Sequence, residues 1–120
     1  MDSDILFLWE GWPSALALYV QLEGRLLERY PGMQIRTTKT QVSFSNRYIF
    51  ALASPPKRKK EDHLVVSFGL GYEKRSPRIF CAAEAARNRW THHVAVRTPE
   101  ELDAELFGWL DEAYAFSAAK

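Results

Sequence analysis

The sequence predicts an α+β domain, in which an antiparallel sheet of about five strands packs on one face against an N-terminal and a C-terminal helix. Two patterns point to this fold class. Apolar residues recur at helical spacing near both ends of the chain, over residues 13–30 and 99–116. Between these segments, polar and apolar residues alternate as they do in half-buried strands. The chain has 120 residues, the usual length of a single domain, so one domain over 1–120 is expected.

The N-terminal helix is expected to begin at Pro13, because proline suits the first helical turn, and to end at Pro31 and Gly32. Residues 1–10 are expected to form an extension that precedes it, with a short helical turn over 4–10 that Ser3 or Asp4 could cap and Gly11 would end. The apolar stripe of the helix consists of Ala15, Leu18, Tyr19, Leu22, Leu26 and Tyr30.

The middle of the chain predicts the strands. The segments that show strand patterns are 33–38, 41–45, 48–53, 64–70 and 91–97, with a shorter one at 79–81. Residues 55–62 are expected to form an exposed basic loop, which contains Lys57, Arg58, Lys59 and Lys60.

The C-terminal helix has the strongest local signal, at its start. Thr98 is an expected N-cap, Pro99 suits the first turn, and Glu101 can complete a capping box by bonding back to the Thr98 amide. The apolar stripe that follows consists of Leu102, Leu106, Trp109, Leu110, Ala113 and Phe116.

Composition narrows the classes of function. The net charge is +1, so the overall charge gives no argument for nucleic acid or an anionic membrane as a partner, and only a local cluster of charges could. No apolar stretch reaches membrane-spanning length. A single cysteine, Cys81, cannot form an intrachain disulfide, so a cytoplasmic location is expected. Histidine and cysteine lack the paired spacing of a zinc site, and no cofactor motif is present, so neither a metal nor a cofactor is expected.

Two adjacent histidines on the last predicted strand are the first candidates for a site. Neighbouring residues on a strand point to opposite faces, so His92 and His93 cannot bind one metal together. His92 shares a face with Trp90 and Val94, which predicts a structural, hydrogen-bonded histidine beneath the helices. His93 shares the opposite face with Thr91.

A polar sheet face is the second candidate. If the strands neighbour one another, Lys39, Gln41 and Ser43 would lie beside Thr91 and His93 and form a shallow polar surface. The competing interpretation is an ordinary solvated sheet face. The candidate ligand-binding residues are Lys39, Gln41, Ser43, Arg89, Trp90, Thr91 and His93.

Several functions remain open. The favoured one is a non-enzymatic module, monomeric or homodimeric, that binds a small polar ligand or a protein partner. The alternative is a small hydrolase that uses His93 or His92 with Ser43 or Lys39. Nucleic-acid binding through the loop at 57–60 is a weaker option, because acidic residues follow that loop at once.

Three stretches resemble an uncharacterised bacterial family, the domain-of-unknown-function family 5655. They are 15–19, 39–47 and 89–94, the last continued by 99–103 and 113–114. The resemblance spans about Gly11 to Phe116 and is weaker over 82–88. It implies a small α+β domain, sometimes at the end of longer bacterial proteins, and implies no particular activity.

Overall fold

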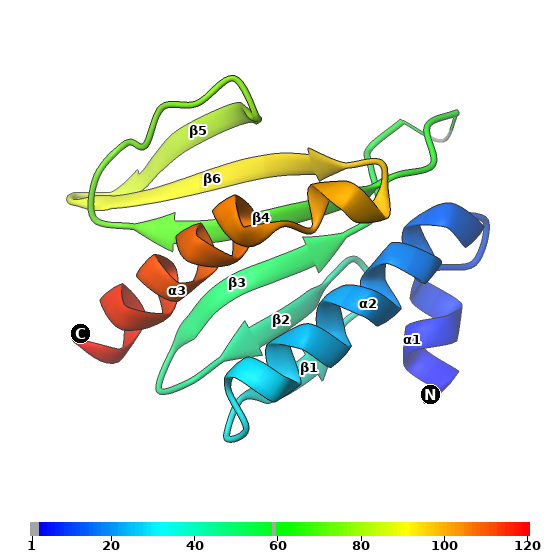
Figure 1. Ribbon diagram of the computed structural model, residues 1–120, viewed down its shortest axis with the longest axis horizontal. Helices are drawn as coiled ribbons and strands as arrows, with labels where there is room; N and C mark the ends of the chain where they lie inside the picture. The colour runs from blue at the N-terminus through cyan, green and yellow to red at the C-terminus, as the bar shows by residue number, and fades with distance from the viewer. Residues whose placement is uncertain (1–2, 59) are drawn as a thin grey trace.

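A six-stranded antiparallel sheet lies at the centre of the computed structural model, which describes residues 3–58 and 60–120 (Figure 1). The elements are α1 (Ser3–Leu8), α2 (Pro13–Arg29), β1 (Gln34–Thr37), β2 (Val42–Ser45), β3 (Ile49–Ser54), β4 (Leu64–Leu70), β5 (Ile79–Ala86), β6 (Arg89–Val96), the 3₁₀ turn η1 (Pro99–Glu101) and α3 (Ala104–Ala118). The strand order is β1-β2-β3-β4-β6-β5. The α+β fold class is thereby confirmed.

The sheet has one strand more than the expected five, because β5 is much longer than the predicted segment at 79–81. Its second half is rich in alanine and shows no alternation of polar and apolar residues, so no strand signal was visible there. Main-chain pairing with β6 extends it to Ala86. Asn88, at a φ of 60°, makes the tight turn between the two strands, since asparagine tolerates this backbone conformation.

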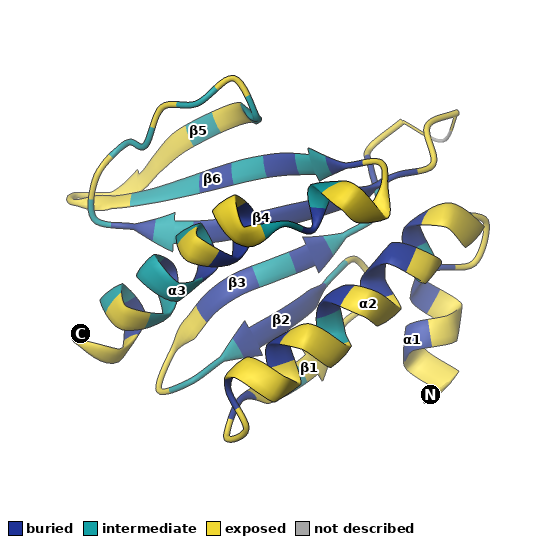
Figure 2. Cartoon of the chain, viewed as in Figure 1, coloured by how far each residue is buried: buried dark blue, intermediate teal, exposed yellow. Residues whose placement is uncertain are grey.

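The two long helices, α2 and α3, lie across the same face of the sheet (Figure 1). The stripe predicted for α2 is buried as expected, and it packs on the central strands to form the core. Within the described residues, no helix covers the opposite face of the sheet (Figure 1). Figure 2 shows that β2, β3 and β4 are mostly buried, whereas β5 at the sheet edge is largely exposed. No helix in the described part of the chain is long and apolar enough to span a bilayer.

The short helical turn expected over residues 4–10 is present as α1, but the segment belongs to the core and is not a simple extension. Ile5, Leu8 and Trp9 are buried members of the core. The ring of Trp9 stacks on Tyr19 of α2, with 5.2 Å between the ring centroids. The expectation missed this burial because two buried residues on a six-residue helix give too short a pattern to reveal a buried face.

The predicted capping box at Thr98 is present, but it caps a separate 3₁₀ turn rather than the α-helix itself. Residues Pro99–Glu101 form the separate turn η1, and the α-helix begins at Ala104. The Asp103 carboxylate is its N-cap and accepts a hydrogen bond from the Leu106 amide at 3.0 Å. The Glu101 carboxylate does bond back as expected, accepting from the amides of Thr98 at 3.1 Å and Arg97 at 2.7 Å. Glu101 therefore stabilises η1, while Asp103 caps the helix.

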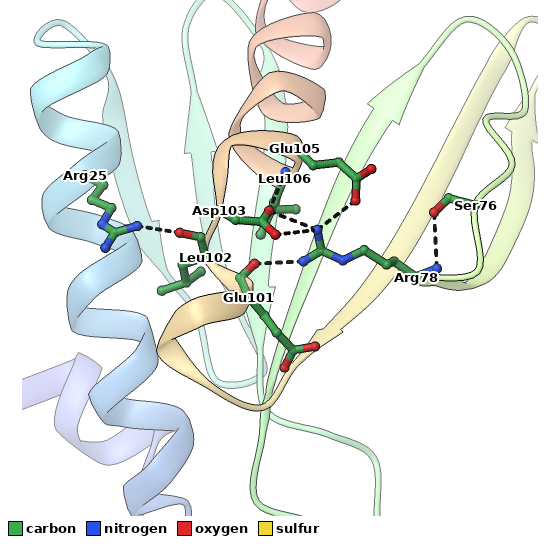
Figure 3. Close-up of polar contacts among 8 residues, drawn as sticks. All are labelled: Arg25, Ser76, Arg78, Glu101, Leu102, Asp103, Glu105 and Leu106. Atoms are coloured by element: carbon green, nitrogen blue, oxygen red, sulfur yellow. Dashed lines mark hydrogen bonds and ion pairs between the residues drawn. The ribbon is translucent and has the colours of Figure 1, made fainter.

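Arg78 ties the segment between β4 and β5 to this helix start (Figure 3). Its guanidinium donates to the carboxylates of Asp103 and Glu105, each at 2.9 Å, and to the carbonyl oxygen of Glu101 at 2.8 Å. A planar guanidinium can serve several acceptors at once, which a lysine ammonium does with less directional fit. One side chain thus fixes the 71–78 segment against both η1 and α3.

The loop between β3 and β4 is partly exposed and partly structural. Lys57, Arg58 and Lys60 are exposed as predicted, while Lys59 lies outside the described residues. Asp62 at the end of the loop accepts hydrogen bonds from the amides of Ser14 and Ala15, both at 2.9 Å. The loop therefore caps the start of α2 across 47 or 48 positions of sequence.

Candidate functional site

A row of paired side chains crosses the sheet on the face away from the helices. Strand register places Ser67 of β4 opposite His93 of β6, and His93 opposite Cys81 of β5. On the other side, Ser67 lies opposite Leu52, which lies opposite Ser43. Directly paired residues share a sheet face, so this row lies on the uncovered side, which we call the outer face.

The outer face is free of acidic groups over its strands. By register and alternation, its members include Gln34, Arg36, Ser43, Ser45, Ile49, Leu52, Ser54, Val65, Ser67, Gly69, Cys81, Ala83, Ala86, Arg89, Thr91, His93 and Ala95. None of these described residues is Asp or Glu. Carboxylates gather instead on the helical side, where Asp103, Asp111 and Glu112 pair with Arg78, Arg29 and Lys74. The outer face therefore favours an anionic or hydrogen-bond-accepting ligand over a cation.

Ser67 and His93 form the central polar contact of this face. The Ser67 hydroxyl oxygen lies 2.6 Å from Nδ1 of His93. Burial lowers the pKa of His93, and the nearby positive charge of Lys57 lowers it further. A lowered pKa favours the neutral imidazole at pH 7, the form that can both donate and accept a hydrogen bond. The exposed ring of Phe80 lies beside it, 6.1 Å between centroids.

His92 faces the helices and is completely buried. Its Nε2 accepts a hydrogen bond from the Lys74 amide at 2.8 Å, and its Nδ1 faces the Phe68 carbonyl oxygen at 3.4 Å. Its ring stacks on Phe68 with 5.0 Å between centroids. These contacts are those of a structural histidine, in agreement with the interpretation from sequence.

A cavity of about 170 Å³ opens where β3 and β4 separate. Pairing between these strands ends at Ala51 and Phe68. The residues that lie beyond this last pair, on both strands, contribute to the walls of the cavity. The lining residues are Ile49, Phe50, Ala51, Leu52, Ser67, Phe68, Gly69, Leu70, Ala85, Arg89, Trp90, Thr91, Phe116 and Lys120. Ser67 thus contributes to both the cavity and the contact with His93.

Two cations meet at this cavity, Arg89 of β6 and Lys120 after α3. Partial burial lowers the pKa of Lys120, and the positive charge of Arg89 lowers it further. The Lys120 ammonium lies over the rings of Phe116 and Tyr48, at 5.1 and 5.9 Å from their centroids. Two neighbouring cations with no carboxylate between them make an electrostatically favourable place for an anion.

The structure brings together only part of the predicted site. Arg89, Trp90 and Thr91 line the cavity, and His93 contacts its wall residue Ser67. Trp90 lies on the helical side as predicted, but it is half-buried rather than buried.

The other part of the predicted site is elsewhere, and the assumption that placed it beside His93 is wrong. Strands β3 and β4 separate β2 from β6, so Ser43 lies on the same face as His93 but three strand spacings away, roughly 14 Å. Its hydroxyl donates to the Arg36 carbonyl oxygen at 3.3 Å. Lys39 and Gln41 precede β2 near the β1–β2 turn. Ser43 and His93 are therefore too far apart for a direct hydrogen bond between a nucleophile and its base.

Sequence reasoning missed the residues that complete the cavity, Ile49, Phe116 and Lys120. Ser67, the hydrogen-bond partner of His93, was not among the candidate residues either. A serine and a histidine can be recognised as partners only when their strands are known to be adjacent, and the sequence does not give the strand order. Lys120 gave no signal, since a cation at the end of an amphipathic helix is ordinary.

Comparison with known proteins gives one match. A family model described as "Domain of unknown function (DUF5655)" matches residues 8–117. No curated protein and no solved structure matches the chain.

Proposed function

The chain belongs to the DUF5655 family, and we propose that it is a non-enzymatic binding module of a bacterial cytoplasmic protein, whose outer face receives a small polar ligand. The observation that carries the proposal is the cavity beside the Ser67–His93 contact, on a face without acidic side chains. A concave site with a few convergent polar groups is the usual form of a small-ligand site.

The polar groups suit recognition of hydrogen-bond acceptors and anions. The Thr91 hydroxyl and the Arg89 guanidinium can donate to a ligand in the cavity. The contact between His93 and the Ser67 hydroxyl joins β6 to β4 beside the cavity, so this part of the cavity wall is fixed before a ligand arrives. Groups positioned in advance lose less conformational entropy on binding.

Binding is favoured over catalysis because the one hydroxyl in contact with His93 is shielded. Ser67 is 3% exposed, whereas a nucleophile must approach a substrate carbonyl to within about 3–3.5 Å. A hydrolase would need Ser67 to become exposed first. The 2.6 Å contact nevertheless makes Ser67, rather than Ser43, the residue to test for the alternative activity.

The proposal is tested by amide NMR spectra recorded while a panel of polar metabolites is added, with thermal unfolding as a second readout. We expect a ligand that shifts the amide signals of Ser67, Thr91 and His93 and raises the unfolding temperature. His93→Ala should weaken its binding at least about tenfold, because the Ser67 hydroxyl loses its partner. Ser43→Ala, on the same face but two strands from Ser67, is the matched control and should leave affinity unchanged.

Two results would overturn the proposal. The first is a panel ligand whose shifts fall on the helical side of the molecule, with the outer face unaffected. The second is hydrolysis of a simple ester such as p-nitrophenyl acetate that is lost in Ser67→Ala and retained in Ser43→Ala. That result would establish the hydrolase alternative in place of a binding module.

A further inference from the structure

We infer that the cavity between β3, β4 and β6 is a site for a small aromatic anion, a single six-membered ring that carries one carboxylate or phosphate group. The inference rests on the proposed function and names the class of ligand. Three observations support it: the size of the cavity, the apolar side chains of its wall, and the two cations that line it.

Size limits the ligand to about one ring. The cavity measures about 170 Å³, and an apolar cavity of about 150 Å³ is known to hold one benzene molecule. A nucleotide or a drug-sized compound requires about 300 Å³ or more. One ring with one small substituent therefore fills the cavity.

The wall offers apolar and aromatic contact to such a ring. Ile49, Leu52 and Phe116 line the cavity, and Gly69 leaves room on the β4 side. A Cβ added at Gly69 would meet no atom closer than 3.9 Å, the carbonyl oxygen of Trp90. Glycine therefore leaves open space here rather than avoiding a clash, and a larger side chain would project into the cavity without disturbing the backbone.

The charges supply the specificity for an anion. Arg89 and Lys120 both line the cavity, and neither has an ion-pair partner among the described residues. The lining contains no Asp or Glu. Two cations that repel each other are stabilised by an anion placed between them. Lys120 is held over Phe116 and Tyr48, so its ammonium lies beside the aromatic wall.

The second cavity does not offer the same combination. It measures about 240 Å³ and lies between β5 and the segment that precedes it. Its cations, Lys74 and Arg75, already pair with Glu112 and Glu73 at 2.9 and 3.1 Å. An incoming anion would have to displace these carboxylates, so the cavity at Arg89 is the favoured anion site.

The test is a titration of the full chain with five compounds, followed by amide NMR and calorimetry. Benzoate and phenyl phosphate carry the ring and the charge, benzyl alcohol lacks the charge, benzylamine reverses it, and acetate lacks the ring. We expect benzoate or phenyl phosphate to shift the amides of Gly69, Arg89 and Thr91, and the stronger of the two identifies the anionic group. Benzyl alcohol, benzylamine and acetate should each bind at least about tenfold more weakly.

Matched variants separate the contributions of charge and space. Arg89→Gln should weaken the aromatic anion about tenfold or more, while Arg87→Gln, at the turn of the same hairpin, should leave the affinity unchanged. Gly69→Val should abolish binding by filling the cavity, and its unfolding midpoint shows whether the fold is intact. If Gly69→Val fails to fold, the comparison of Arg89→Gln with Arg87→Gln decides the matter.

Equal binding of benzyl alcohol and benzoate, or full affinity in Arg89→Gln, would overturn the inference. If none of the ring compounds binds while a polar metabolite shifts Ser67 and His93, the inference fails and the proposed function stands. If neither the ring compounds nor the metabolite panel shifts the outer face, both fail.

Discussion

The Nε2 atom of His92 accepts a hydrogen bond from the backbone N–H of Lys74 at 2.8 Å. An imidazole nitrogen can accept only when it carries no proton, so the proton of neutral His92 is on Nδ1, which faces the Phe68 carbonyl oxygen. This bond joins β6 to the 71–78 segment on the buried side of the sheet. Protonation of Nε2 would break it.

The first prediction concerns pH. Burial lowers the pKa of His92 in the folded protein, and the charge of Lys74 lowers it further, against the opposing influence of the Phe68 carbonyl, Glu73 and Glu112. Below about pH 6.5 the unfolded chain therefore takes up a proton that the folded protein resists. The free energy of unfolding should be highest above that pH and should fall as the pH drops toward the lowered pKa.

His92→Gln isolates this contribution, because glutamine does not titrate. Its unfolding free energy should fall less steeply between pH 6.5 and 5 than that of the wild type, as measured by urea melts at a series of pH values. His63 and His93, whose pKa values are also lowered mainly by burial, contribute slopes of the same sign to both proteins. Identical slopes in the two proteins would show that His92 is not held neutral by the fold.

The second prediction concerns the loop that caps α2. Asp62→Ala should destabilise the protein by about 1–2 kcal/mol, because the amides of Ser14 and Ala15 lose their acceptor. Glu61→Ala, at the preceding exposed position, is the control and should change stability by less than about 0.5 kcal/mol. Urea melts of the two variants give the comparison, and equal losses would contradict a specific cap.

The third prediction compares the contribution of Asp103 to stability with that of Thr98. Asp103→Ala should cost about 1–2 kcal/mol, since it removes the helix N-cap and a partner of Arg78. Thr98→Ala should cost less, because the Glu101 carboxylate bonds to the Thr98 backbone amide, which the substitution retains. The order of the unfolding midpoints checks this, and a larger loss for Thr98→Ala would restore it as the principal cap.

The fourth prediction concerns Arg78 (Figure 3). Arg78→Lys keeps the charge but cannot reach Asp103, Glu105 and the Glu101 carbonyl together, so about 1–2 kcal/mol should be lost. Hydrogen exchange should quicken in the 71–78 segment more than in β2 and β3. Arg75→Lys is the control, since Arg75 is exposed and pairs only with nearby Glu73; equally rapid exchange in both variants would argue against the role of Arg78.

The fifth prediction concerns His93. Replacement by alanine should cost less than about 2 kcal/mol, because the residue is half-buried and its partner hydroxyl can rotate toward another acceptor. His92→Ala should cost more, since it removes a fully buried ring and leaves the Lys74 amide unpaired. Thermal and urea unfolding of both variants provide the test; the reverse order would make His93 the structural histidine.

The sequence predicts those parts of the fold that depend on residues close together along the chain. The stripe of α2 and the strands at 41–45 and 64–70 were predicted because periodicity is a local property. The alternation of side chains along a strand also placed His92 and His93 correctly on opposite faces. Strand order is not local, and this is why Ser43 was grouped with His93 although β3 and β4 separate them.

The site shows the same division. Arg89, Trp90 and Thr91 belong to one contiguous stretch that was named from the sequence, and all three line the cavity. Lys120 and Ile49 reach the same cavity from distant parts of the chain, and the gap between β3 and β4 that creates the cavity is set by where their pairing ends. Neither feature can be recognised from the spacing of residues along the sequence.

The strand order β1-β2-β3-β4-β6-β5 has a consequence for how the chain folds. Strands β1 to β4 follow one another along the sheet, and β5 with β6 is a hairpin joined by a tight turn, so each group forms mainly short-range contacts. The β4–β6 pairing, from Leu64 with Val96 to Leu70 with Trp90, is the step that closes a long loop. We therefore expect substitutions at this seam, such as Val66→Ala, to slow refolding in stopped-flow experiments, whereas Ile35→Ala at the far edge should chiefly speed unfolding.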